Sequence, residues 1–565
     1  MRHRASLALS SALALGAVLP VAAGTQPARA RGGMVATQEA RASQVGVQAL
    51  ADGGTAVDAA VATAFALAVT HPTAGNIGGC GFLLLRTAAG DAVAYDFRET
   101  APAGASATMW LKDGRYDPQR HHFSHLAVGV PGTVAGLHLA WKEHGSLPWK
   151  RLVEPAVALA RDGFVVTDGL ARSLAGVLPE MKPYPASVAA FTKDGVPYQM
   201  GDLLKQPDLA RTLQRIADQG PAGFYEGETA ELVEREMKAN GGLVTRADLA
   251  AYRPQKRVPL RGTYRGYDVI TMPPVSSGGT ALLQMLNTLE GDDLAASGWG
   301  SAATVHLVAE AMRRAYADRA RWQGDPAFNP TLGDTVQRLI SKPYAAALRK
   351  TIRADRASPS SPRSFEWPAE SAETTHFSVM DGARNAVALT YTLEYGYGSR
   401  IVVPGAGFLL NNEMGDFNAG PGLTDAEGLI GTEPNLAAPG KRMLSSMTPT
   451  ILAKDGQPFL AVGAMGGRTI INSVLLTILN VVDFGMNIQD ALDAPRFHHQ
   501  WLPDRIAYEP FGLSPDTRAL LAARGHTLFE IEKQGDAQGV VYDAKNGVFE
   551  GGADRRDRGG AAVGR

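Results

Sequence analysis

The stretch AETTHFSVMD, residues 372–381, places two threonines side by side where a β-strand is expected to begin. Thr is common in strands, so an adjacent pair is not by itself evidence of a functional site. The preceding residues 358–371 read SPSSPRSFEWPAES, and this Ser/Pro-rich composition predicts an extended, exposed segment. Exposed segments of this kind are where chains are most easily cut. The chain leading to Thr374 is therefore predicted to be a cleavable leader.

The residues that follow predict a β-hairpin. TTHFSVM and AVALTYTL flank the turn-type cluster DGARN. If Met380 pairs with Ala386, Thr374 lies opposite Thr392, with Cβ atoms about 4.5–5.5 Å apart, where a hydroxyl could hydrogen-bond it. Glu394, two residues further along, is expected on the same face of the strand.

A strand-initial threonine after a cleavable leader predicts a particular nucleophile. Cutting the peptide bond between Glu373 and Thr374 would free the α-amine of Thr374. That amine can act as the base for the hydroxyl of its own residue. Thr374 is therefore the candidate nucleophile. A phosphate-binding loop is not indicated, because the Gly-rich stretch NIGGCG lacks the GK[ST] ending.

The N-terminus predicts export. Arg2 and Arg4 give a basic start, residues 7–23 are largely apolar, and small residues offer cleavage sites near Gly24 and Arg31. We interpret residues 1–30 as a signal peptide that leads to the periplasm or the cell exterior. A retained membrane anchor is the less favoured alternative, because Ser and Pro break the apolar run and it is short for a span. No span is expected in the mature chain.

Composition is that of an ordinary soluble globular protein. The chain has 565 residues, of which 45% are hydrophobic and 20% charged. The length alone suggests three or four domains, unless one large α/β fold accounts for it. A formal net charge of −1 argues against a nucleic-acid partner. Cys80 is the only cysteine, so no internal disulfide can form, and we expect a packed small residue there.

A series of motifs, in conserved order and spacing, resembles the γ-glutamyltranspeptidase family of N-terminal-nucleophile hydrolases. The resemblance covers nearly all of the mature chain. The motifs are ARASQVGVQALADGGTAVDAA, NIGGCGF, DFRETAP, GVPGTVAGL, GGLVTRADLAAY, MPPVSSGG, ETTHFSV, LLNNEMGDF, KRMLSSMTPT, GAMGGRTIIN and APRFHHQWLPD.

The resemblance implies a fold, a maturation step and an activity. The fold would be an α/β (α+β) chain arranged as a four-layer αββα sandwich. The chain would cut itself into a large subunit, 31–373, and a small catalytic subunit, 374–565, which form one fold as a heterodimer. The enzyme would transfer the γ-glutamyl group of glutathione-like substrates to water, an amino acid or a dipeptide. No metal or organic cofactor is implied.

The resemblance also assigns roles to individual residues. Thr374 matches the nucleophile and Thr392 a second threonine that hydrogen-bonds it. The backbone N–H groups of Gly466 and Gly467 match an oxyanion hole, which is a major catalytic contribution. The residues that match the substrate's α-carboxylate site are Arg98, Ser445 and Ser446, and those that match its α-ammonium site are Glu394, Glu413 and Asp416.

Structural alternatives exist for these residues. Arg98 could form an ion pair with Glu99 or another acid, and the glycine pair could form a simple β-turn. The threonines, serines and acids could be ordinary strand, turn and surface residues. A zinc site at His498 and His499 is disfavoured, because no third ligand has suitable spacing.

The sequence departs from the family pattern at three places. Gly415 stands where an acid is common, Cys80 replaces a frequent glycine, and Glu427 lies in a lid-like loop where some members carry an aromatic residue.

Two alternative functions remain: a glutaryl or cephalosporin acylase of the same family, and an uncut secreted binding protein. The three acids disfavour the acylase, because a glutaryl group has no ammonium. The intact Thr374, Thr392 and glycine pair disfavour the binding protein.

Overall fold

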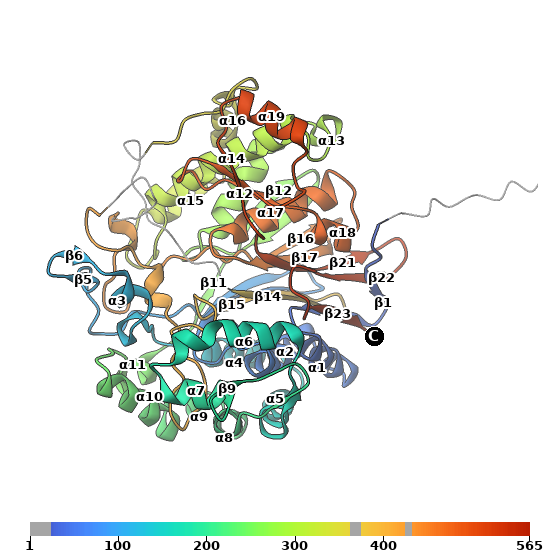
Figure 1. The fold of residues 1–565 in the computed structure, drawn as a ribbon. Coiled ribbons are helices and arrows are strands. Elements are labelled where there is room, and N and C mark those ends of the chain that lie inside the picture. The colour runs from blue at the N-terminus through green and yellow to red at the C-terminus, as the bar shows by residue number, and fades with distance from the viewer. Residues whose placement is uncertain (1–23, 362–373, 424–431) are drawn as a thin grey trace, which may run out of the picture.

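Two antiparallel seven-stranded sheets lie face to face, and helices cover the outer face of each (Figure 1). The structure is a computed structural model that describes residues 24–361, 374–423 and 432–565. The predicted four-layer αββα sandwich is confirmed. The chain therefore forms one large α/β fold, and the three or four separate domains suggested by length are not needed.

The first sheet contains the Thr374 hairpin at its centre. In spatial order its strands are β11 (Gln255–Arg257), β4 (Ala92–Asp96), β3 (Cys80–Arg86), β15 (Ala386–Thr392), β14 (Thr375–Asp381), β2 (Gly33–Thr37) and β23 (Ala561–Gly564). Strands from before and after the predicted cut are therefore hydrogen-bonded to each other on both sides of the hairpin. A cut before Thr374 would leave the two halves joined within this sheet.

The second sheet also combines strands from both halves. Its order is β1 (Ala28–Ala30), β22 (Val548–Ala553), β21 (Asp536–Asp543), β17 (Gln457–Met465), β16 (Thr450–Lys454), β13 (Tyr267–Thr271) and β12 (Leu260–Tyr264). β1 bears on the signal peptide, because cleavage near Arg31 would remove this paired strand, whereas cleavage near Gly24 would keep it. Residues 1–23 lie outside the described residues.

Helices form the two outer layers. The layer on the first sheet includes α1 (Ala40–Ala51), α2 (Ala56–Thr70), α4 (Thr133–His144), α5 (Trp149–Asp162) and α8 (Pro207–Gln219). The layer on the second sheet includes α12 (Gly278–Leu289), α14 (Ala302–Trp322), α16 (Lys342–Lys350), α17 (Thr469–Val482) and α18 (Ile488–Asp493). None of the helices within the described ranges is both long enough and apolar enough to cross a membrane.

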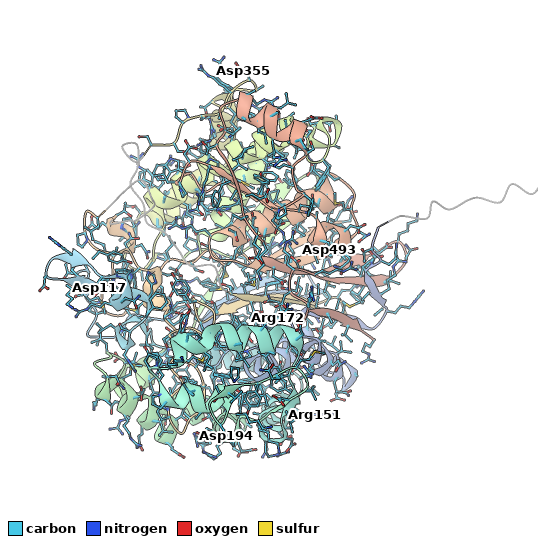
Figure 2. The ribbon with its side chains drawn as sticks, in the orientation of Figure 1. Asp117, Arg151, Arg172, Asp194, Asp355 and Asp493 are labelled. Atoms are coloured by element: carbon cyan, nitrogen blue, oxygen red, sulfur yellow. The ribbon has the colours of Figure 1, made fainter. Side chains whose placement is uncertain are left out.

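Shorter elements complete the chain. The remaining helices are α3 (Pro118–His122), α6 (Asp168–Met181), α7 (Pro185–Phe191), α9 (Ala222–Tyr225), α10 (Gly227–Ala239), α11 (Arg246–Ala251), α13 (Leu294–Ser297), α15 (Leu332–Leu339), α19 (Pro515–Ala523), η1 (His125–Ala127), η2 (Glu413–Asp416) and η3 (Glu433–Asn435). The remaining strands are β5 (Leu111–Lys112), β6 (Arg115–Tyr116), β7 (Phe164–Val165), β8 (Thr192–Lys193), β9 (Val196–Pro197), β10 (Leu203–Leu204), β18 (Phe497–His498), β19 (Ile506–Tyr508) and β20 (Leu528–Glu530). Charged side chains such as Asp194 and Asp355 lie at the outer edge of the molecule (Figure 2).

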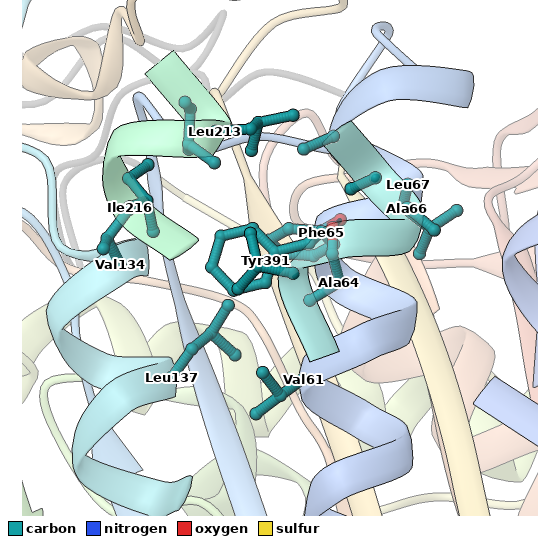
Figure 3. Packing of buried hydrophobic residues seen from close by; sticks show 14 of the residues in the cluster. Val61, Ala64, Phe65, Ala66, Leu67, Val134, Leu137, Leu213, Ile216 and Tyr391 are labelled. Carbon is teal, nitrogen blue, oxygen red and sulfur yellow. Dashed lines mark hydrogen bonds between the residues drawn. The ribbon is translucent and has the colours of Figure 1, made fainter. Parts of the chain in front are cut away.

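The register of the hairpin is the one predicted. Met380 pairs with Ala386, and the ladder continues to Thr375 opposite Tyr391. Side chains alternate along the strands, so Phe377, Val379 and Tyr391 pack toward the α1/α2 layer. Tyr391 lies among Phe65, Leu137 and Ile216 in this core (Figure 3). The opposite face of the hairpin, which carries Thr392, points between the two sheets.

The two sheets are in close contact beside the nucleophile strand. His376 of β14 is fully buried and hydrogen-bonds Thr390 Oγ1 at 2.8 Å and Ser378 Oγ at 2.9 Å. Gly463 of β17 faces its ring, and a Cβ atom at Gly463 would overlap the imidazole, with Cγ only 2.8 Å away. The missing side chain of Gly463 is therefore a condition for this sheet-to-sheet contact.

Gly463→Ala should destabilise the protein, because overpacking a close-packed core costs about 1–3 kcal/mol. We expect a lower melting temperature in thermal unfolding. Gly176→Ala is the matched control, because Gly176 lies in α6 with open space around it, and alanine there should stabilise by about 0.5–1 kcal/mol. Equal melting temperatures for Gly463→Ala and the wild type would contradict the packing described here.

Candidate active site

A pocket opens where the hairpin ends between the sheets, and it encloses about 270 Å³ of empty space if the open solvent at its mouth is included. It brings together predicted site residues that are far apart in the sequence. Its lining residues are Arg98, Thr374, Thr392, Glu394, Glu413, Asp416, Ser445, Ser446, Met447, Gly467 and Ile470. Of the other predicted site residues, Gly466 does not line this cavity, and Glu373 and Glu427 lie outside the described residues.

Thr374 and Thr392 face each other at the floor of the cavity. Their hydroxyl oxygens are 3.4 Å apart, and both residues are almost fully buried. The backbone N–H of Glu394 donates to Thr392 Oγ1 at 2.9 Å. Asn76 donates to the carbonyl of Thr392 at 2.9 Å, which fixes the backbone at this point. The predicted pairing of the two threonines is therefore present, while their catalytic roles remain predictions.

Glu394 reaches the cavity by a different route from the one expected. β15 ends at Thr392, so Glu394 is not on a continuing strand, and the prediction of a shared strand face is wrong in this respect. Its φ of 80° lies in the left-handed region, which a non-glycine residue adopts at a cost of about 1–3 kcal/mol. The bend that this backbone creates directs the chain into the pocket.

Arg98 is fully buried and held by several groups. Its guanidinium pairs with Glu413 through Nη1 and with Asp416 through Nη2. It also donates to the carbonyl oxygens of Met443 at 3.2 Å and Leu444 at 2.9 Å. The alternative of an ion pair with other acids is thus realised in this structure. A substrate carboxylate would therefore join a cation that already has two carboxylate neighbours.

Burial sets the direction of the pKa shifts of two carboxyl groups near Arg98. Loss of solvation raises the pKa of Glu99 to about 8, although the nearby Arg98 cation opposes the shift. Glu99 is therefore mostly protonated at neutral pH. Burial also raises the pKa of Glu413, again against the effect of Arg98. The acidic side chains near Arg98 thus carry fewer negative charges than their number suggests.

Glu99 and Glu413, together with Cys80, form the candidate metal-ligand group within the described ranges. Cys80, Glu99 and Glu413 each offer a ligand atom, and these atoms lie within 4.8 Å of one another. However, Arg98 contacts both Cys80, at 3.3 Å, and Glu413. Because a guanidinium cation already occupies this position, we assign no metal to the group. Burial also raises the pKa of the Cys80 thiol, which fits a packed residue rather than a nucleophile.

Ser445 and Ser446 line the wall opposite the hairpin. The carbonyl of Ser445 accepts from the N–H of Ser277 at 2.8 Å, which ties this loop to the start of α12. Arg319 of α14 donates to Ser446 Oγ at 2.9 Å.

The glycine pair leads into α17. Gly466 has a φ of 126° and Gly467 a φ of 55°, both in the region that favours glycine. The carbonyl of Gly466 accepts from Thr469 Oγ1 at 2.7 Å. Because α17 begins at Thr469, the partial positive charge of its N-terminus lies next to the cavity. This arrangement favours negative charge at Gly467, as an oxyanion hole requires.

His498 and His499 are structural in this fold. His498 contacts Asn472 at 2.7 Å and Gln500 at 2.8 Å through its two ring nitrogens. His499 accepts from the N–H of Trp501 at 3.0 Å and contacts Asp504 at 3.2 Å. With both nitrogens of each ring engaged by protein groups, the zinc hypothesis finds no support here.

Several site residues were not predicted from the sequence. Met447 directly follows the serine pair, and Ile470 follows the glycine pair by three residues. Their position beside predicted site residues in the same motifs is the signal that could have identified them. Asn76, Ser277 and Arg319 support the lining from behind. They lie far from Thr374 in the sequence, and only the tertiary fold brings them there.

Comparison with known proteins supports the family assignment. A family model described as gamma-glutamyltranspeptidase matches residues 42–564. The chain is 48% identical to the glutathione hydrolase proenzyme of Escherichia coli K12 over 535 residues, which cover 94% of this chain and 91% of the relative.

Solved structures of two proteins also resemble this chain. The cephalosporin acylase of Bacillus halodurans matches with a TM-score of 0.84 at 28% identity and covers 97% of this chain and 99% of its own. The γ-glutamyltranspeptidase of Helicobacter pylori matches with a TM-score of 0.55 at 46% identity, over 56% of this chain and 91% of its own. The chain therefore belongs to the γ-glutamyltranspeptidase family of N-terminal-nucleophile hydrolases and is a γ-glutamyltransferase enzyme.

Proposed function

We propose that this protein is an exported, self-processing enzyme that transfers the γ-glutamyl group of glutathione and related compounds to water, an amino acid or a dipeptide. The observation that carries the proposal is the position of the Thr374 hydroxyl in a cavity with one buried arginine and three acids. Such a cavity suits a substrate whose far end carries both a carboxylate and an ammonium. The proenzyme name of the E. coli relative supports a processed precursor.

Maturation is the first step of the proposal. Cleavage between Glu373 and Thr374 converts the amide nitrogen of Thr374 to an α-amine. The large subunit ends at Glu373, and the small subunit runs from Thr374 to Arg565. The interleaved strands of both sheets hold the two subunits together as a heterodimer. The signal peptide would be removed after export, and cleavage near Gly24 would preserve β1.

Catalysis then proceeds through an ester. Thr374 Oγ attacks the γ-carbonyl carbon of the donor while the α-amine of Thr374 takes the hydroxyl proton. The tetrahedral oxyanion is stabilised by the backbone N–H groups of Gly466 and Gly467. Its collapse breaks the γ-amide bond, and the leaving amine takes the proton from the α-amine. Water or the amine of an acceptor attacks the ester, returns a proton to Thr374 Oγ and releases the γ-glutamyl product.

Donor recognition uses the charged and hydroxyl side chains that line the cavity beside the two threonines. Arg98, Ser445 and Ser446 offer hydrogen-bond donors to the α-carboxylate. Glu394, Glu413 and Asp416 offer negative charge to the α-ammonium.

The second candidate function is a glutaryl or cephalosporin acylase, which the similarity to the B. halodurans acylase favours. A glutaryl donor has no ammonium, so it would add no cation to these three acids, of which only Glu413 and Asp416 pair with Arg98 in the structure.

Thr374→Ala should abolish both self-cleavage and turnover, because one hydroxyl serves both reactions. Thr374→Ser should retain part of each, since the hydroxyl is kept. Intact-mass measurement of purified protein reports the cut, and release of anilide from γ-glutamyl anilide reports turnover. A processed and active Thr374→Ala variant would remove Thr374 from the nucleophile role, as would active wild-type protein that consists only of uncut chain.

Glu394→Gln should weaken γ-glutamyl donors more than glutaryl donors, because only the former carry an ammonium. Loss of a charged hydrogen bond costs about 1.5–3 kcal/mol, roughly a ten- to hundredfold fall in kcat/KM. The test compares kcat/KM for γ-glutamyl and glutaryl anilides in the wild type and the variant. A wild type that prefers the glutaryl anilide would establish the acylase instead.

A further inference from the structure

Glu394 needs a positioning group, because it lies beyond the end of β15 at a strained bend. Its backbone is held by Thr392 Oγ1, which accepts from its N–H at 2.9 Å. That bond fixes the main chain but leaves the side-chain torsions to be set by other contacts. The direction of the carboxylate must therefore be set by groups that touch it.

His122 is such a group. Its Nδ1 lies 3.2 Å from Glu394 Oε1 in the buried interior. The residue comes from α3, a short helix that is distant in sequence from Glu394. Its own position is fixed, because Asn412 donates to its carbonyl at 3.0 Å and the rings of His121 and Tyr395 pack against it at 4.3 Å and 5.5 Å.

The ring is uncharged at neutral pH. Burial lowers the pKa of His122 to about 4, although Asp416 opposes the shift. The other groups that face the ring are His121, which packs on it, and Tyr116, whose hydroxyl lies 3.4 Å from Nε2. A neutral imidazole with its hydrogen on Nδ1 donates to Glu394 and accepts at Nε2. Such a contact orients the carboxylate without cancelling its charge, in contrast to the cationic contacts that Arg98 makes with Glu413 and Asp416.

Gly415 supplies the space for this contact. A Cβ atom at residue 415 would overlap His122 Nδ1 and would lie 2.7 Å and 2.8 Å from the two carboxylate oxygens of Glu394. Gly415 is not among the residues with positive φ, so its backbone does not require glycine. The requirement is steric. Gly415 is also one of the departures from the family pattern, where an acid is common.

We propose that His122 is a positioning residue that aims Glu394 at the donor's α-ammonium, and that Gly415 is required because any side chain there would separate the two. The inference rests on the proposed γ-glutamyl donor. It also predicts that a change at position 415 and a change at position 122 affect the same contact, so their effects should not add.

The first test is selectivity in two variants of His122. His122→Leu keeps apolar volume and removes the donor, so kcat/KM for γ-glutamyl anilide should fall about tenfold or more, mainly through KM. The value for glutaryl anilide should stay near that of the wild type. His122→Asn places an amide N–H near the position of Nδ1 and should restore most of the selectivity. His125→Leu is the control, because His125 pairs with Glu236 outside the cavity and should leave the selectivity unchanged.

The second test is a double-mutant cycle. Gly415→Ala in the wild type should lower γ-glutamyl selectivity about as much as His122→Leu does. In a His122→Ala background the added methyl group no longer meets the imidazole, and the space left by the ring lets the Glu394 carboxylate move away from it, so Gly415→Ala should cost less than threefold. Self-cleavage of each variant, read by intact mass, confirms that the protein folds.

Two results would overturn the inference: unchanged selectivity in processed His122→Leu, or additive losses in the cycle. The selectivity of the wild type in the same assay judges the proposed function separately. A wild type that prefers glutaryl anilide rejects the γ-glutamyl donor, whereas a wild type that prefers γ-glutamyl anilide with no change on His122 substitution rejects only the role of His122.

Discussion

The register between β14 and β15 is the constraint on which the rest of the site depends. Met380 opposite Ala386 places Thr374 across from Thr392 at the open end of the ladder, on the face between the sheets. A slip of one residue would turn that face toward the α1/α2 core and bury the nucleophile among Phe65 and Leu137. The packing of Tyr391 on one face of the strand therefore fixes the register that places Thr392 on the other face.

The second constraint is charge balance in a buried space. Arg98 has no exposed surface, and a lone buried cation would be very costly. Glu413 and Asp416 pair with it in the structure, and burial raises the pKa of both Glu413 and Glu99. A donor that carries both a carboxylate and an ammonium adds no net charge to this network. The recognition of both groups by one network therefore leaves the net charge of the pocket unchanged when the donor binds.

Much of this account could be predicted from the sequence. The hairpin was predictable because its turn cluster and alternating strands are local signals. The cavity residues came from resemblance to a family, because residues such as Arg98 and Ser446 meet only through tertiary contacts. The bend at Glu394 and the contact from His122 were not predicted, since a strained φ and a meeting of distant segments leave no periodic pattern.

The central claim is that Thr374 is the residue that carries the γ-glutamyl group. The most direct measurement is peptide mapping by mass spectrometry after the enzyme is mixed with a γ-glutamyl donor and quenched in acid during turnover. If Thr374 is the nucleophile, a γ-glutamyl ester is expected on the N-terminal residue of the small chain, Thr374, and none in the Thr374→Ala protein. A γ-glutamyl group on any other residue, or its presence in the Thr374→Ala protein, would contradict the account.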